Sequence, residues 1–196
     1  MRRPRIRPTA TMAPTMMASL ISPARVAPRM RARDVRQVVG ELVRLATAKA
    51  ALDCDVVCRA VLERGEASTF GFGRGVAIPH AAILGLDRPI GAFARLKLAQ
   101  DFGATDNIPA DLVFLLLSPE GDDPTHLQAL ACAARRLRDR EVAARLRSAK
   151  DGEAIHVVLT SDAWREPDEP EPGHSDTRPA NDLTNGAMCT SLEASC

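Results

Sequence analysis

The feature that most constrains the fold is an uninterrupted apolar run at residues 112–117, which read Leu-Val-Phe-Leu-Leu-Leu. A run of this length is typical of a β-strand and is short for a helix. A strand that is apolar on both faces is expected in the middle of a sheet whose two faces are covered by helices. We therefore predict an α/β fold built around this strand.

Two segments before the run have helical periodicity. Residues 35–46 place apolar side chains three and four positions apart, directly after Asp34, which is a suitable N-cap. A second helix is expected to begin after Asp53, with Val56 among the residues on its inner face, and to end at Gly65. Both helices are predicted to pack on the sheet.

Two further helices are predicted after the run. Asp123 is a suitable N-cap for the first of these helices, and Pro124 suits its first helical position. The apolar stripe of this helix is expected to include Leu127. Asp139 is expected to cap a further short helix. Residues 151–162 fit either a strand or a closing helix, and the pattern leaves both open.

A glycine-rich stretch at residues 71–80 ends in a proline and a histidine. Its glycines, which can adopt positive φ and allow a tight turn or a close approach, are Gly71, Gly73 and Gly75. Residues 76–78 are predicted to form a short strand that ends at Pro79, since proline has no N–H to donate. His80 would then stand at a strand end, before a loop over residues 81–88. The pattern alone leaves its imidazole open as base, metal ligand, nucleophile or structural residue.

Two other residues are candidates for the same site. His126 is expected in the first turn of the helix that follows residues 112–117, and Arg64 in the last turn of the second helix. Because sites in α/β sheets gather where strands end, His80 and His126 are expected to meet. The alternatives are an exposed first-turn histidine and an arginine that only complements a helix dipole.

Composition excludes several classes of function. Only 3% of the residues are aromatic and the net charge is +1, which argues against nucleic-acid binding. The five cysteines have no spacing typical of a disulfide framework or a zinc site, so we expect buried thiols in a reducing cytosol. No apolar run reaches the roughly 18 residues of a membrane span, so a cytoplasmic protein without membrane insertion is expected.

The stretch at residues 71–80 resembles the active-site sequence of the fructose/mannitol-type (type 2) enzyme IIA domain of the bacterial phosphotransferase system. The resemblance is closest to the stand-alone nitrogen-regulatory IIA and extends over residues 20–163. It includes residues 20–26 (Leu-Ile-Ser-Pro-Ala-Arg-Val), the pair Glu63-Arg64, residues 111–117 and residues 126–130, in the family's order.

The resemblance implies a mixed sheet of about five strands, flanked by helices on both faces, and a phosphoryl relay. It implies that His80 accepts a phosphoryl group from the phosphorylated carrier protein HPr. His126 would donate a hydrogen bond to the phosphate and Arg64 would stabilise it. The residues expected to frame the site are Gly71, Gly73, Gly75 and Pro79. No cofactor and no metal is implied. Ala81 and Ala82 depart from the family's usual pattern after the histidine.

The function expected from this resemblance is that of a regulatory phosphocarrier. The alternatives are a sugar-transport IIA component that passes phosphate to separate IIB and IIC chains, and a binding module on the same fold that acts without phosphorylation. One domain is predicted over residues 18–164. An arginine- and proline-rich arm at residues 1–17 and an acidic tail at residues 165–196 are expected to be disordered.

Overall fold

The computed structural model describes residues 16–162 of the 196-residue chain. Its elements in chain order are α1 (Met16–Leu20), η1 (Pro23–Arg25), β1 (Val26–Met30), α2 (Val35–Thr47), α3 (Cys54–Ala67), β2 (Gly71–Gly73), β3 (Val76–Ala77), β4 (His80–Ile83), β5 (Ile90–Gln100), β6 (Ala110–Pro119), α4 (Asp123–Arg138), α5 (Arg140–Ser148) and α6 (Gly152–Thr160). α1 thus begins two residues before the predicted domain boundary. The rest of the predicted arm and the whole predicted tail lie outside the described residues.

The sheet is mixed and has six strands in the order β1-β5-β6-β3-β2, with β4 also paired to β6. β5 runs antiparallel to β6, whereas β1 is parallel to β5, and both β3 and β4 are parallel to β6. Because β5 occupies one edge of β6, β3 and β4 share the other, with Val76 opposite Leu112 and His80 opposite Leu116. The six strands therefore fill five positions, which agrees with the sheet implied by the resemblance.

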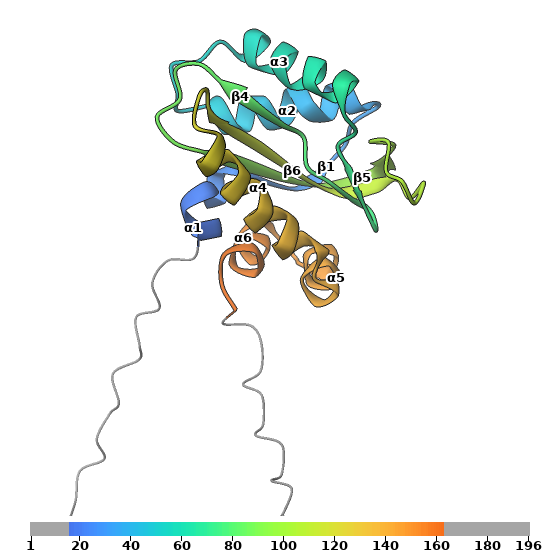
Figure 1. Cartoon of the computed structure of the whole chain (residues 1–196). Coiled ribbons are helices and arrows are strands. Elements are labelled where there is room, and N and C mark those ends of the chain that lie inside the picture. Colours follow the sequence, from blue (N-terminus) through green and yellow to red (C-terminus); the bar gives the residue numbers. More distant parts are fainter. Residues whose placement is uncertain (1–15, 163–196) are drawn as a thin grey trace, which may run out of the picture. The chain divides into compact units, whose positions relative to one another are not determined.

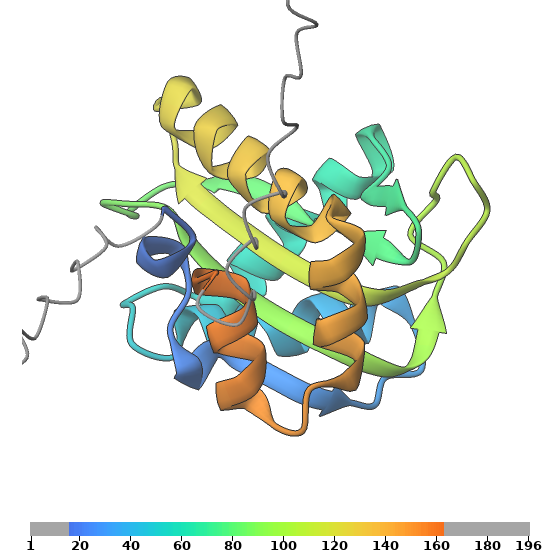
Figure 2. The same ribbon diagram turned by 90° about the horizontal axis from the view of Figure 1, so that it is seen from below.

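Helices cover both faces of this sheet (Figure 1). α2 and α3 pack on one face, and α1, α4, α5 and α6 lie on the other, where Figure 2 shows α4 to α6 across the strands. The six residues of the apolar run are all 0% exposed and alternate between the two cores. Each such side chain contributes about 1.5–3 kcal/mol by burial. The prediction of a central strand covered on both faces is confirmed.

The two helices that follow β1 begin as predicted. The side chain of Asp34 accepts a hydrogen bond from a backbone N–H of α2, and Asp53 does the same for α3. The predicted end of α3 at Gly65 is wrong, since the helix continues to Ala67. Gly65 is needed for space, because a Cβ there would lie 2.5 Å from the ring of Phe70. Val56 is 57% exposed, so its assignment to the inner face is also wrong.

α4 differs from its prediction in two details. Asp122, not Asp123, is the N-cap and accepts from the backbone N–H of Thr125. Leu127 is 62% exposed, because α4 turns a face of small residues, including Ala129 and Ala133, to the sheet. Asp139 caps α5 as predicted. The open alternative for residues 151–162 is decided in favour of a helix, α6.

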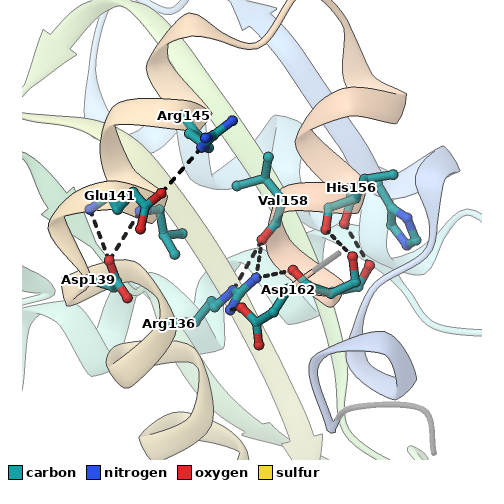
Figure 3. A network of polar contacts seen from close by, with 11 residues as sticks. Arg136, Asp139, Glu141, Arg145, His156, Val158 and Asp162 are labelled. Atoms are coloured by element: carbon teal, nitrogen blue, oxygen red, sulfur yellow. Dashed lines mark hydrogen bonds and ion pairs between the residues drawn. The ribbon is translucent and has the colours of Figure 1, made fainter. Parts of the chain in front are cut away.

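Two arginines tie the helices of one face together. Arg95 of β5 donates to the carbonyl oxygens of Pro28, Leu146, Arg147 and Ala149, at 2.7–2.9 Å, and so joins β1 to the end of α5. Arg136 of α4 donates to the carbonyls of Val158 and Ser161 and pairs with Asp162 at 2.6 Å, which fixes the end of α6 (Figure 3). Among residues 16–162 no helix is both long and apolar enough to cross a lipid bilayer.

Candidate functional site

The candidate site begins at an interruption in the strand pairing. The ladder on β6 is interrupted at Ile78 and Pro79: the N–H of Ile78 donates to the carbonyl of Phe70, and the Pro79 carbonyl accepts from Leu116. Pairing resumes at His80, the first residue of β4. The predicted strand end at Pro79 is therefore only an interruption, and residues 81–83, predicted as loop, belong to β4. Proline cannot donate to the ladder, but a parallel partner is regained one residue later.

His80 is held in one orientation by its surroundings. The imidazole is 7% exposed, and its Nδ1 lies 2.8 Å from the carbonyl oxygen of Ile78. A carbonyl oxygen only accepts, so Nδ1 carries the proton that it donates there, and Nε2 of the neutral ring keeps its lone pair. The ring of Phe70 meets it edge-on, with the centroids 5.7 Å apart. The geometry therefore leaves the lone pair of Nε2 available.

The structure brings the two predicted histidines together. His126, in the first turn of α4, has its ring centroid 5.5 Å from that of His80, with the planes tilted by 43°. Its Nδ1 lies 2.9 Å from the Oγ of Ser118, a fully buried residue of β6. Sequence reasoning missed Ser118. The available signal was a lone small polar residue directly after the apolar run.

Burial and charge both keep the imidazoles neutral. Burial lowers the pKa of His80, the hydrogen bond to Ile78 raises it, and the charges of His126 and Arg64 lower it again. Burial is also the main cause that lowers the pKa of His126. The charge of Arg64 lowers this pKa further, and the charge of Asp123 raises it. Both rings are therefore neutral at neutral pH, and Nε2 of His80 keeps an unprotonated lone pair.

Arg64 supplies the positive charge at this site. It lies in the last turn of α3 and is exposed, and its charge acts on both imidazoles. Within residues 16–162 its guanidinium has no ion-pair partner. A free guanidinium beside two neutral imidazoles, all three predicted from the sequence, is an arrangement suited to an anion such as a phosphoryl group.

The glycine-rich stretch mainly builds a tight hairpin. Arg74 (φ 57°) and Gly75 (φ 77°) form a two-residue turn between β2 and β3. The N–H of Arg74 donates to Asp106 at 2.7 Å, and its carbonyl accepts from Arg147, which also binds both carboxylate oxygens of Asp111 at 2.7 Å. This turn thus lies at the beginning of β6, whereas the imidazoles lie near its end.

The other framing residues differ in their distance from the imidazoles. Gly71 is required by close packing, since a Cβ there would lie 2.5 Å from the backbone of Ala104. Gly73 has φ 82° and lies against the Asp106 carboxylate, which also accepts the N–H of Arg74 in the turn that follows. Pro79 directly precedes His80 and is buried. The framing role of the glycines stays a prediction, and the described contacts give them a structural part in the hairpin.

Other candidate chemistry is limited in the described part of the chain. Cys54, Cys58 and Cys132 are free, partly buried thiols. Burial raises the pKa of Cys58 and of Cys132. Among residues 16–162 no three His, Cys, Asp or Glu side chains form a group that could hold a metal ion. Ala81 and Ala82 belong to β4, where they pair with Leu117 and Ser118.

Residues 19–162 match the family model described as "Phosphoenolpyruvate-dependent sugar phosphotransferase system, EIIA 2". The chain is similar to a nitrogen regulatory protein of Bradyrhizobium diazoefficiens, with 39% identity over 143 residues, 73% of this chain and 94% of that protein. A nitrogen regulatory protein of Escherichia coli is 34% identical over 142 residues, 72% of this chain and 86% of that protein.

Solved structures share the fold. The crystal structure of nitrogen regulatory protein IIA-Ntr from Neisseria meningitidis superimposes with a TM-score of 0.68 and 26% identity, covering 72% of this chain and 97% of that one. IIA mannitol from Escherichia coli gives a TM-score of 0.58 at 18% identity over 71% of this chain and 98% of that one, and is similar in fold.

Proposed function

Because the chain belongs to the EIIA type 2 family of the phosphoenolpyruvate-dependent sugar phosphotransferase system, we propose that it accepts a phosphoryl group on His80 from a phosphorylated HPr-type carrier and acts as a phosphorylation-dependent regulator. The family is a phosphotransfer component of that system. The observation that carries the proposal is the state of His80: a neutral ring, with Nδ1 bound to a carbonyl and Nε2 left as the nucleophile.

The transfer step is balanced without a net exchange of protons. The phosphorus–nitrogen bond in the donor's phosphohistidine breaks as a bond forms between phosphorus and Nε2 of His80. The donor ring, which is protonated on its other nitrogen and positively charged before transfer, leaves as a neutral imidazole, and the His80 ring takes up the positive charge. Its Nδ1 proton stays in place, and the hydrogen bond to Ile78, at 2.8 Å, stabilises that charge.

Two residues, His126 and Arg64, are proposed to stabilise the transferred group. Phosphoryl transfer depends mainly on positioning and on charge stabilisation at the phosphoryl oxygens. The Nε2–H of His126 donates to one oxygen when the hydroxyl of Ser118 donates to its Nδ1. Arg64 adds a planar pair of donors, and each charge-assisted hydrogen bond contributes about 1.5–3 kcal/mol.

The relatives favour regulation over transport as the role. The chain covers 94% and 86% of two proteins named as nitrogen regulatory proteins, but only 21% of a fructose-specific EIIABC component of Bacillus subtilis. Transport is the second candidate, since a solved complex pairs enzyme IIA mannitol with phosphorylated enzyme IIB and shares this fold. A phosphorylation-independent binding module is the third candidate.

The direct test is incubation of the chain with ³²P-labelled phospho-HPr. We expect label on the wild type, none on His80→Ala, and slower labelling of Arg64→Gln with an unchanged circular dichroism spectrum. His156→Gln is the matched control, because His156 is a half-buried histidine that contacts the carbonyl of Ile21, away from β4. Label retained in His80→Ala would refute the relay.

A second experiment separates the candidate roles. The labelled chain is mixed with a IIB domain of the fructose or mannitol type. Retention of the label supports the regulatory role, and rapid passage to the IIB domain supports transport. An unlabelled wild-type chain in the first experiment would leave the binding module as the function.

A further inference from the structure

A cationic cavity lies at the same end of the sheet as the imidazole pair. It has a volume of about 560 Å³ and lies between η1, the loop from α2 to α3, and the turn from β4 to β5. Ile90, in its wall, pairs with Leu117, the neighbour of the Leu116 that pairs with His80. Neither imidazole of the candidate site lines this cavity, so it is a separate site.

Positive charge exceeds negative charge in this cavity. Arg25, Lys49 and Arg88 line it together with one acid, Asp87, which leaves a net charge of +2. Within residues 16–162 none of the three cations has an ion-pair partner within 4.0 Å. Burial, followed by the charge of Arg88, lowers the pKa of Arg25. Bringing like charges together costs free energy that a bound anion would offset.

The shape of the cavity favours a small molecule. Ligand sites of about 300–1,000 Å³ are typical for metabolites and cofactors. Leu86 and Ile90 give the cavity an apolar wall beside its cations. Gly85 has φ 86°, and a Cβ there would lie 3.6 Å from Leu52 of the α2–α3 loop, so the two loops that form the cavity run close to each other. The cavity is thus part of the folded domain.

We propose that this cavity binds a small phosphorylated metabolite, with its phosphate or diphosphate group held by Arg25, Lys49 and Arg88 and its organic part against Leu86 and Ile90. Guanidinium groups bind phosphate oxygens in pairs, and a lysine ammonium binds phosphate as a point charge. A dianionic phosphate matches the net charge of the cavity, whereas a single carboxylate leaves one positive charge unmatched.

The test is a titration of the full ¹⁵N-labelled chain with pyrophosphate, followed by NMR. We expect saturable shifts of the Gly85 and Ile90 amides. Arg25→Gln combined with Arg88→Gln should weaken binding at least about tenfold, because both guanidiniums lose charge-assisted hydrogen bonds. The control combines Arg138→Gln with Arg140→Gln, which makes the same change in net charge on α4 and α5 and should leave affinity unchanged.

Two further arms distinguish this site from others. The titration is repeated in Arg64→Gln, where the imidazole site is impaired, and the shifts of Gly85 should persist. Citrate replaces pyrophosphate to test whether carboxylates bind equally well. The proposal is overturned by shifts that do not saturate, by shifts confined to the neighbours of His126, by equal weakening in the control, or by equal affinity for citrate.

Discussion

The hydrogen bond between Ser118 and His126 allows a sharp test of the candidate site. Ser118 is fully buried, and its Oγ lies 2.9 Å from Nδ1 of the imidazole. If the hydroxyl donates, the ring proton stays on Nε2, where the proposed relay needs a donor to the phosphoryl group. Ser118→Ala removes one hydrogen bond of about 0.5–1.5 kcal/mol. We therefore expect phosphoryl transfer to slow by roughly two- to tenfold, since about 1.4 kcal/mol is a factor of ten.

The assay combines a rate with a direct readout of the ring. The transfer rate is measured as the initial rate of labelling from phospho-HPr. The tautomer of His126 is read by ¹⁵N NMR, and it would not change if Ser118 had only a structural role. Ser148→Ala is the control, because its exposed hydroxyl at the end of α5 donates only to the carbonyl of Arg145. A wild-type rate and an unchanged tautomer in Ser118→Ala would refute the positioning role.

Three further predictions concern stability. The folded pKa of His80 lies below its ordinary value of 6.5, so the unfolded chain binds more protons near and below that pH. The free energy of unfolding should therefore fall as the pH drops through 6.5, and it should fall less in His80→Gln. Urea denaturation about one pH unit either side of 6.5 measures this fall. An equal fall in both proteins would contradict the prediction. Arg95→Met removes the donors to four carbonyls, so the free energy of unfolding measured by urea denaturation should fall by about 2–4 kcal/mol. The exposed Arg140→Met should lose less than about 0.5 kcal/mol. Equal losses would refute the role of Arg95. Gly65→Ala places a Cβ 2.5 Å from the Phe70 ring, and the overpacking of about 1–3 kcal/mol should exceed the roughly 1 kcal/mol of added helix propensity; a more stable variant would show that the ring moves freely.

The fold was largely predictable because its main signals are local. N-caps at Asp34, Asp53 and Asp139 depend on side chains that bond within three residues, and all three are confirmed. Errors arose where packing overrides local pattern. Leu127 fits a helical stripe, yet α4 turns its alanine face inward and leaves this side chain 62% exposed. Gly65 fits a helix end, yet it is a contact point for the Phe70 ring.

The site was predictable in its residue types but not in its internal bonds. His80, His126 and Arg64 were named from strand ends, helix ends and family resemblance, and the structure brings the two rings to 5.5 Å. The partners of the rings were not predictable. Ser118 and the carbonyl of Ile78 each bind an Nδ1 atom, and hydrogen bonds of this kind depend on side-chain orientation in the folded state.

The sequence by itself determined the central strand and the caps of three helices, because hydrophobic period and capping act over a few neighbouring residues. Only the tertiary structure decided that the chain rejoins β6 at His80 after Pro79, and that the glycine turn lies at the other end of that strand. The registers of β3 and β4 on β6 set both positions. The sequence pattern of residues 76–83 did not reveal the register of β4, because it is set by which face of β4 is buried against its partners in the folded sheet.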